Sequence, residues 1–167
     1  HLMAFVNAEN HDWDLQKDLN FEEIKDLEGA LEGLPKGVGD YFMWEKFMTK
    51  PYVDNGTFRL IGESPTPWPS FVIAVRNEVL EENPDTIKTI LEVINEVTKD
   101  FKEIPLIAEL IAKRYGQEIE DVLEWLELTH WSQEQLSVET LEKVQDQLFK
   151  LRLIDKTLPP DQLLNNL

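Results

Sequence analysis

Cysteine is absent from this sequence of 167 residues, which excludes disulfides, thiolate metal sites and a cysteine nucleophile. Basic side chains are scarce: 16 Lys and Arg stand against 33 Asp and Glu, which gives a net charge of −17. Such a field repels phosphate groups, so neither nucleic acid nor anionic lipid is expected as a partner. Long apolar runs are also missing, since no stretch approaches the roughly 18 residues that span a bilayer. The sequence therefore predicts neither nucleic-acid binding nor a membrane-spanning segment.

Motifs of catalysis and of cofactor binding are missing as well. Histidine occurs three times, and no two histidines have the spacing of a helical zinc site. The sequence has no glycine-rich phosphate loop and no Gly-x-Ser-x-Gly elbow, and we can assemble no nucleophile–base pair from it. We therefore expect a protein that is not an enzyme and that has no metal and no cofactor.

The hydrophobic content of 42% is enough for a real core. Apolar or alternating residues predict strands, and helical spacing predicts helices between them. The predicted strands are 19–24, 41–44, 57–62 and 71–75, and the predicted early helices are 1–13 and 26–34. Strand–helix–strand order is typical of a largely parallel sheet. The sequence thus predicts an α/β fold with a small, mostly parallel sheet.

After residue 76 only helical patterns occur. Their predicted ranges are 83–101, 106–114, 119–128 and 138–151. A helical C-terminal region is therefore expected to follow the α/β part. The predicted organisation is an α/β region at 1–70, a crossover strand with C-terminal helices at 71–157, and a loose tail at 158–167.

Two tryptophans near predicted strand ends are the main candidates for ligand contact. In an open parallel sheet, ligands meet the carboxyl ends of strands, where Trp44 and Glu45 are expected to lie. Trp68 stands between Pro67 and Pro69, which fix its backbone and lower the entropy that ligand binding costs. The alternatives are a core tryptophan beside a surface glutamate at 44–45, and a rigid connector whose Trp68 packs on a helix.

Four further residues complete the candidate site. Thr66, Pro67 and Ser70 belong to the same proline segment, 65–70, as Trp68. His1 heads a predicted helix, where free N–H groups attract anions. These residues favour a small organic or anionic ligand.

The sequence also resembles a known family. Leu27-Glu28-Gly29-Ala30-Leu31, the stretch 37–45, Asp54–Phe58 and Phe71–Val75 occur in an order similar to the periplasmic-binding-protein-like class II fold. The most similar group is the NMT1/THI5-like substrate-binding proteins, which include the binding components of ABC importers for sulfonates, nitrate and thiamine precursors. The resemblance covers most of residues 1–155, and it implies two α/β lobes with the ligand held between them.

The match begins partway through that fold, because 1–6 looks like the helix that follows a ligand loop in the family. The resemblance therefore implies that His1 is native and that the chain is a fragment starting inside lobe two. On this interpretation apolar surface is left exposed, or a homodimer covers it.

The function implied is non-catalytic binding of a solute, delivered to an ABC transporter permease. Periplasmic location follows from the resemblance, while the sequence itself leaves the compartment open. One alternative is an enzyme similar to the THI5 pyrimidine synthases, which use a pyridoxal cofactor and iron; Lys46 and Lys50 are the lysines nearest the expected cleft. Another alternative is a helical interaction module.

Overall fold

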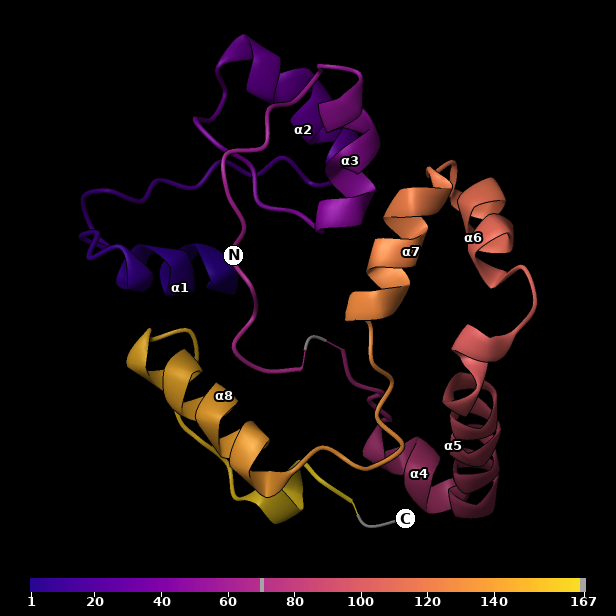
Figure 1. Ribbon diagram of the computed structural model, residues 1–167. Helices are drawn as coiled ribbons and strands as arrows, with labels where there is room; N and C mark the ends of the chain where they lie inside the picture. Colours follow the sequence, from indigo (N-terminus) through magenta and orange to yellow (C-terminus); the bar gives the residue numbers. More distant parts are fainter. Residues whose placement is uncertain (70, 166–167) are drawn as a thin grey trace. The chain divides into compact units, whose positions relative to one another are not determined.

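The computed structural model describes residues 1–69 and 71–165, and the chain divides into two compact units, His1–Thr66 and Pro67–Leu167 (Figure 1). Unit 1 contains α1 (Leu2–Asn10), α2 (Leu27–Gly33), the 3₁₀ helix η1 (Leu34–Lys36) and α3 (Lys46–Asp54). Unit 2 contains α4 (Asn77–Glu82), α5 (Pro84–Lys99), η2 (Phe101–Glu103), α6 (Ile107–Tyr115), α7 (Ile119–Leu128), α8 (Val138–Lys150) and η3 (Pro160–Gln162). The division falls a few residues before the predicted boundary at 70, and the roles assigned to the two regions stay predictions.

The prediction of an α/β fold with a mostly parallel sheet is wrong. No residue in the ranges 1–69 and 71–165 forms a strand. The segments 19–24, 41–44, 57–62 and 71–75 all lie outside helices, as a strand would, but they are not paired into a ladder. A strand is stable only when its N–H and C=O groups bond to a neighbouring strand. Apolar composition supplies the side chains of a strand but not that partner.

The long helices of unit 2 follow the predicted ranges, whereas α3 and α4 were missed. Pro51 lies inside α3, and a proline in a helix interior removes a backbone donor and usually ends the helix. Asn83 precedes α5, and its side chain makes no cap there. Its Nδ2 atom instead donates to the carbonyl of Val79 in α4, 3.2 Å away.

A close backbone contact shapes the start of α2. The Asp26 carboxylate caps this helix by accepting the N–H of Gly29 at 2.9 Å. The Asp26 N–H donates to the carbonyl of Ile24 at 2.8 Å, which makes a tight turn around Lys25 at φ 68°. This turn directs the Ile24 carbonyl at Gly29, where a β-carbon would collide with its oxygen. Glycine is therefore required at position 29.

In unit 2, α6 and α7 form a helical hairpin with the best-defined core (Figure 1). Gly116 ends α6 in the left-handed conformation, at φ 66°. The buried residues of the hairpin are Ala108, Ala112, Val122 and Leu126. Trp131 packs against this core and contacts the rings of Phe101 and Trp125 at centroid distances of 5.0 and 5.9 Å. Trp131 is thus a packing residue.

Helix α8 holds the chain that follows it. Ser137 caps the helix, since its Oγ atom accepts the N–H of Thr140 at 3.1 Å. The buried Gln145 makes a two-fold contact with the backbone of Leu158. Its Nε2 atom donates to the Leu158 carbonyl at 3.1 Å, and its Oε1 atom accepts the Leu158 N–H at 2.7 Å. The first residue of the predicted tail is therefore fixed against α8.

The buried side chains are few and small. Among the described residues the buried apolar side chains are Ala4, Val6, Ala8, Ala30, Ala108, Ala112, Val122 and Leu126, and no large side chain is fully buried. The accessible surface is 13087 Å². Two separate compact bodies with the masses of the two units would together expose about 10,000 Å². Many large apolar side chains of the described residues are exposed, among them Phe71, Leu106 and Leu110.

A membrane-spanning role finds no support in the described ranges, because none of their helices combines the length and the apolar character needed to cross a bilayer.

Candidate ligand-binding surface

Four aromatic rings of unit 1 form a connected surface, which we call the aromatic surface: Phe42, Trp44, Tyr52 and Phe58. The rings of Phe42 and Trp44 are stacked, with centroids 5.4 Å apart and an interplanar angle of 21°. Phe58 contacts Phe42 at 6.2 Å and Tyr52 at 5.9 Å. Trp44 ends this row and is 48% exposed. It therefore presents part of its ring to solvent while Phe42 supports it.

The predicted turn at Asp54–Thr57 places Phe58 in this surface. The side-chain oxygen of Asn55 accepts the N–H of Thr57 at 3.0 Å and its hydroxyl at 2.7 Å. Gly56 adopts φ 81°, which favours glycine. The chain then reverses, and the Phe58 N–H donates to the Tyr52 carbonyl at 2.8 Å. The turn prediction is confirmed, and it explains how residues on either side of it come together.

Glu45 begins α3. Its Oε2 atom accepts the N–H of Met48 at 2.7 Å, so this carboxylate caps the helix. The Thr49 hydroxyl strengthens the same turn by contacts with the carbonyls of Glu45 at 3.2 Å and Lys46 at 3.0 Å. Glu45 thus has a structural role, and its contact with a ligand stays a prediction. By capping the helix it fixes the point at which the chain leaves Trp44.

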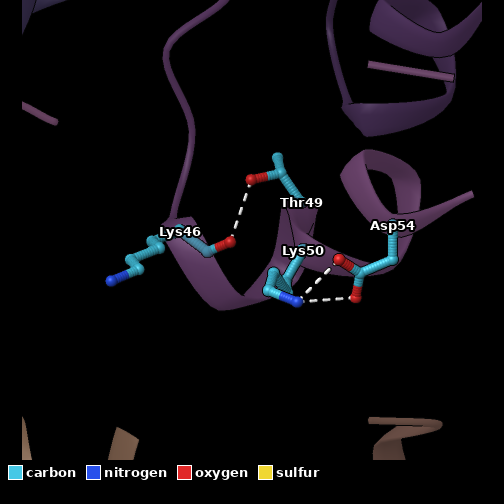
Figure 2. A network of polar contacts seen from close by, with 4 residues as sticks. All are labelled: Lys46, Thr49, Lys50 and Asp54. Carbon is cyan, nitrogen blue, oxygen red and sulfur yellow. Dashed lines mark hydrogen bonds and ion pairs between the residues drawn. The ribbon is translucent and has the colours of Figure 1, made fainter. Parts of the chain in front are cut away.

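Both lysines near the aromatic surface form ion pairs. Figure 2 shows Lys50 with its ammonium group between the two carboxylate oxygens of Asp54, at 2.6 and 2.7 Å. The side chain of Lys46 points away from that pair, and its Nζ atom lies 3.0 Å from Oε1 of Glu63. The ion pair between Lys46 and Glu63 connects the start of α3 to the segment at the end of unit 1. Positive charge beside the aromatic surface is therefore largely neutralised.

The other predicted site residues lie apart from this surface in the sequence. The exposed His1 contacts the rings of Phe5 and Phe21 at 5.0 and 4.5 Å. Thr66 is exposed and ends unit 1.

The remaining candidates belong to the segment after that boundary. Pro67 begins unit 2 and is exposed, and Trp68 is half-buried in a bend beside it. Ser70 lies outside the described residues. Trp44 and Trp68 belong to different units, so a cleft shared by them stays a prediction.

The sequence reasoning missed Phe42, Tyr52 and Phe58 as members of a site. One signal was present: Phe42 and Trp44 are two residues apart in a non-helical segment, a spacing that puts side chains on the same side. Another was the Asn-Gly turn between Tyr52 and Phe58, which brings its flanks together. An exposed indole with a ring stacked behind it offers a flat face to a planar ring or a cation.

Comparison with known proteins gives a consistent class. A family model described as Ca3427-like PBP matches residues 1–64. No curated protein matches the chain.

A solved structure is also similar to this chain. It is the conserved Candida albicans CA3427 gene product, described as defining a new family of proteins with the generic periplasmic binding protein structural fold. The TM-score is 0.81 at 24% sequence identity, over 94% of this chain and 54% of that chain. The chain thus spans about half the length of this neighbour, and the two matches together support a periplasmic-binding-protein-like fold class.

Proposed function

We propose that this chain is part of a non-catalytic solute-binding protein in which Trp44 supplies a stacking surface for a small organic or anionic ligand. The observation that carries the proposal is the half-exposed Trp44 ring, stacked on Phe42 within the residues that the family model matches. Membership of the NMT1/THI5-like group and delivery of the solute to an ABC transporter permease are part of the same proposal.

The openness of the aromatic surface favours a site completed by more protein. Small-molecule sites usually bury roughly 70–90% of the surface of a drug-sized ligand. An open surface cannot cover a ligand to that extent. The chain covers 54% of its structural neighbour, so a longer protein has the length to close over Trp44. The proposal therefore includes the interpretation of this chain as a fragment.

The ion pairs support a binding role over an enzyme with a Schiff-base lysine. A lysine acts as a nucleophile only as the neutral amine. Lys50 contacts both carboxylate oxygens of Asp54, and Lys46 forms an ion pair with Glu63, so each ammonium group already has a carboxylate partner within the chain.

Isothermal titration of the complete protein that contains this chain, with an alkanesulfonate, nitrate and an aminopyrimidine, tests the proposal. We expect Trp44→Ala to weaken binding of the preferred compound about ten-fold or more, because the variant loses about 1 kcal/mol of aromatic stacking and, in addition, the apolar area that the ring buries against the ligand. Trp44→Phe, which keeps a flat ring, should retain most of the affinity.

Trp13→Phe is the matched control for this experiment. Trp13 also belongs to unit 1, but it contacts His11 and Tyr41 and lies outside the aromatic surface. Equal losses in Trp13→Phe and Trp44→Ala would contradict the proposal. The proposal would also be contradicted if none of the three compounds bound.

A further inference from the structure

The segment 59–63 leaves the aromatic surface and returns to the start of α3. Phe58, the last ring of that surface along the chain, is held at the last turn of α3 by the bond from its N–H to the Tyr52 carbonyl, at 2.8 Å. At the other end of the segment, Oε1 of Glu63 lies 3.0 Å from Nζ of Lys46, the first residue of α3. The segment therefore runs along α3 in the direction opposite to the helix, from its last turn to its first.

The ion pair is the contact that keeps this segment beside the helix. In the described part of the chain, no hydrogen bond between backbone groups involves residues 59–63, and all five residues are exposed. Along α3, Lys46 and Tyr52 are about 9 Å apart, at about 1.5 Å per residue, whereas an extended chain from Phe58 to Glu63 would reach about 17 Å. The segment is therefore slack, and it can move away from α3 once the ion pair opens.

Both ends of the segment are connected to the candidate ligand contact, Trp44. At one end, Lys46 follows Trp44 by two residues, and Glu45 between them caps α3. At the other end, Phe58 contacts Phe42, on which the Trp44 ring is stacked. All these residues lie within the range 1–64 that the family model matches. A displacement of the segment would thus reach Trp44 through the chain on one side and through two ring contacts on the other.

We propose that Glu63 is a positioning residue of the aromatic surface: by pairing with Lys46 it restrains the segment 59–63 and so holds the Trp44 ring in the orientation that a ligand meets. A ring that is held before binding loses less conformational freedom when the ligand arrives, which favours affinity. The inference rests on the proposed function, in which Trp44 stacks on the ligand. It adds a residue that contacts no ligand and acts through the start of α3.

The second ion pair of α3 offers a matched control. Lys50 and Asp54 both belong to α3 and lie one turn apart, so their pair closes on the helix itself (Figure 2). The two pairs are similarly exposed, at 32% and 51% for the side chains of Lys46 and Glu63 and at 34% and 45% for those of Lys50 and Asp54. Asp54→Asn therefore removes the same charge from a lysine of the same helix but does not release the segment 59–63.

Isothermal titration of the complete protein that contains this chain, with whichever of the alkanesulfonate, nitrate and aminopyrimidine binds best, measures the effect on affinity. We expect Glu63→Gln to weaken binding about two- to five-fold, as the loss of a half-exposed ion pair would, and Asp54→Asn to leave it unchanged. Exchange of the pair, Lys46→Glu with Glu63→Lys, should restore most of the lost affinity, because the contact forms again with its charges reversed. Equal losses in Glu63→Gln and Asp54→Asn would overturn the inference, since they would show a general effect of charge.

Arg59, inside the segment, provides a second measurement that needs no ligand. Trypsin cleaves after arginine, and cleavage of a folded protein follows the population of the locally opened form, so the rate of the cut after Arg59 reports how firmly the segment is held. We expect this cut to be about two- to five-fold faster in Glu63→Gln than in the natural protein or in Asp54→Asn.

The two measurements separate this inference from the proposed function. An unchanged cut after Arg59 would show that the ion pair does not hold the segment, and a faster cut with unchanged affinity would show that the held segment does not serve Trp44. Either result would overturn the inference and leave the proposed function standing, because the titration of Trp44→Ala tests that function by itself. If none of the three compounds bound, both would be contradicted.

Discussion

Leu126→Ala is expected to lower the free energy of unfolding of unit 2 by about 2–3 kcal/mol, which is near the lower end for buried leucines. Leu126 is the largest buried residue of the hairpin core, and its neighbours there are Ala108, Ala112 and Val122. Alanine and valine side chains are too short to fill the space that a lost leucine leaves. Thermal unfolding followed by tryptophan fluorescence should show a midpoint lower by about 10 °C or more.

Leu123→Ala is the control for this prediction. It makes the same chemical change on the same helix, but Leu123 is 54% exposed. Its effect should stay within about 0.5 kcal/mol. Trp125 and Trp131, which pack against the core, report on the hairpin directly. Similar shifts for both variants would show that α6 and α7 do not enclose a core.

Gly29→Ala is expected to destabilise unit 1 by about 1–3 kcal/mol, even though alanine is the better helix former. The new β-carbon would collide with the carbonyl oxygen of Ile24, a backbone atom held by the tight turn at Lys25. The turn must open or the first turn of α2 must shift, and either change weakens the cap from Asp26. Helical circular dichroism during thermal unfolding measures the loss.

Gly62→Ala provides the matched comparison for Gly29→Ala. Gly62 also belongs to unit 1, but a β-carbon there meets open space. The substitution should leave the midpoint within a few degrees of the natural protein. If Gly29→Ala were as harmless, the close approach of α2 to Ile24 would not exist in solution.

The sequence predicted helices well where apolar residues repeat at helical spacing. The long helices α5 and α8 follow such repeats closely. The sequence did not predict α3, because a proline such as Pro51 is unusual inside a helix. The aromatic residues before Lys46 also have high β-propensity, which favoured a strand. It also failed for the sheet. Strand formation depends on a partner distant in sequence, and local composition carries no information about whether that partner is present.

For the candidate site, the sequence predicts Trp44 as a ligand contact, which stays a prediction, but it does not reveal that Phe42 supports the Trp44 ring. Trp44 was selected because it follows an apolar run, whereas its contact with Phe42 depends on the angle between two rings. The ligand contact expected of Glu45 stays a prediction; in the structure its carboxylate accepts the N–H of Met48 and caps α3. The sequence does not reveal this capping role, because it does not show at which residue the helix begins.

The small residues at the α6–α7 contact have a consequence for how the protein responds to urea. Separating α6 from α7 exposes a core of four small or medium-sized side chains, an apolar area that is small compared with unfolding of the whole chain. The dependence of stability on denaturant scales with that area, and so does the heat capacity of unfolding. Opening of the hairpin should therefore depend only weakly on denaturant concentration. The two helices can separate locally while the rest of the chain stays folded.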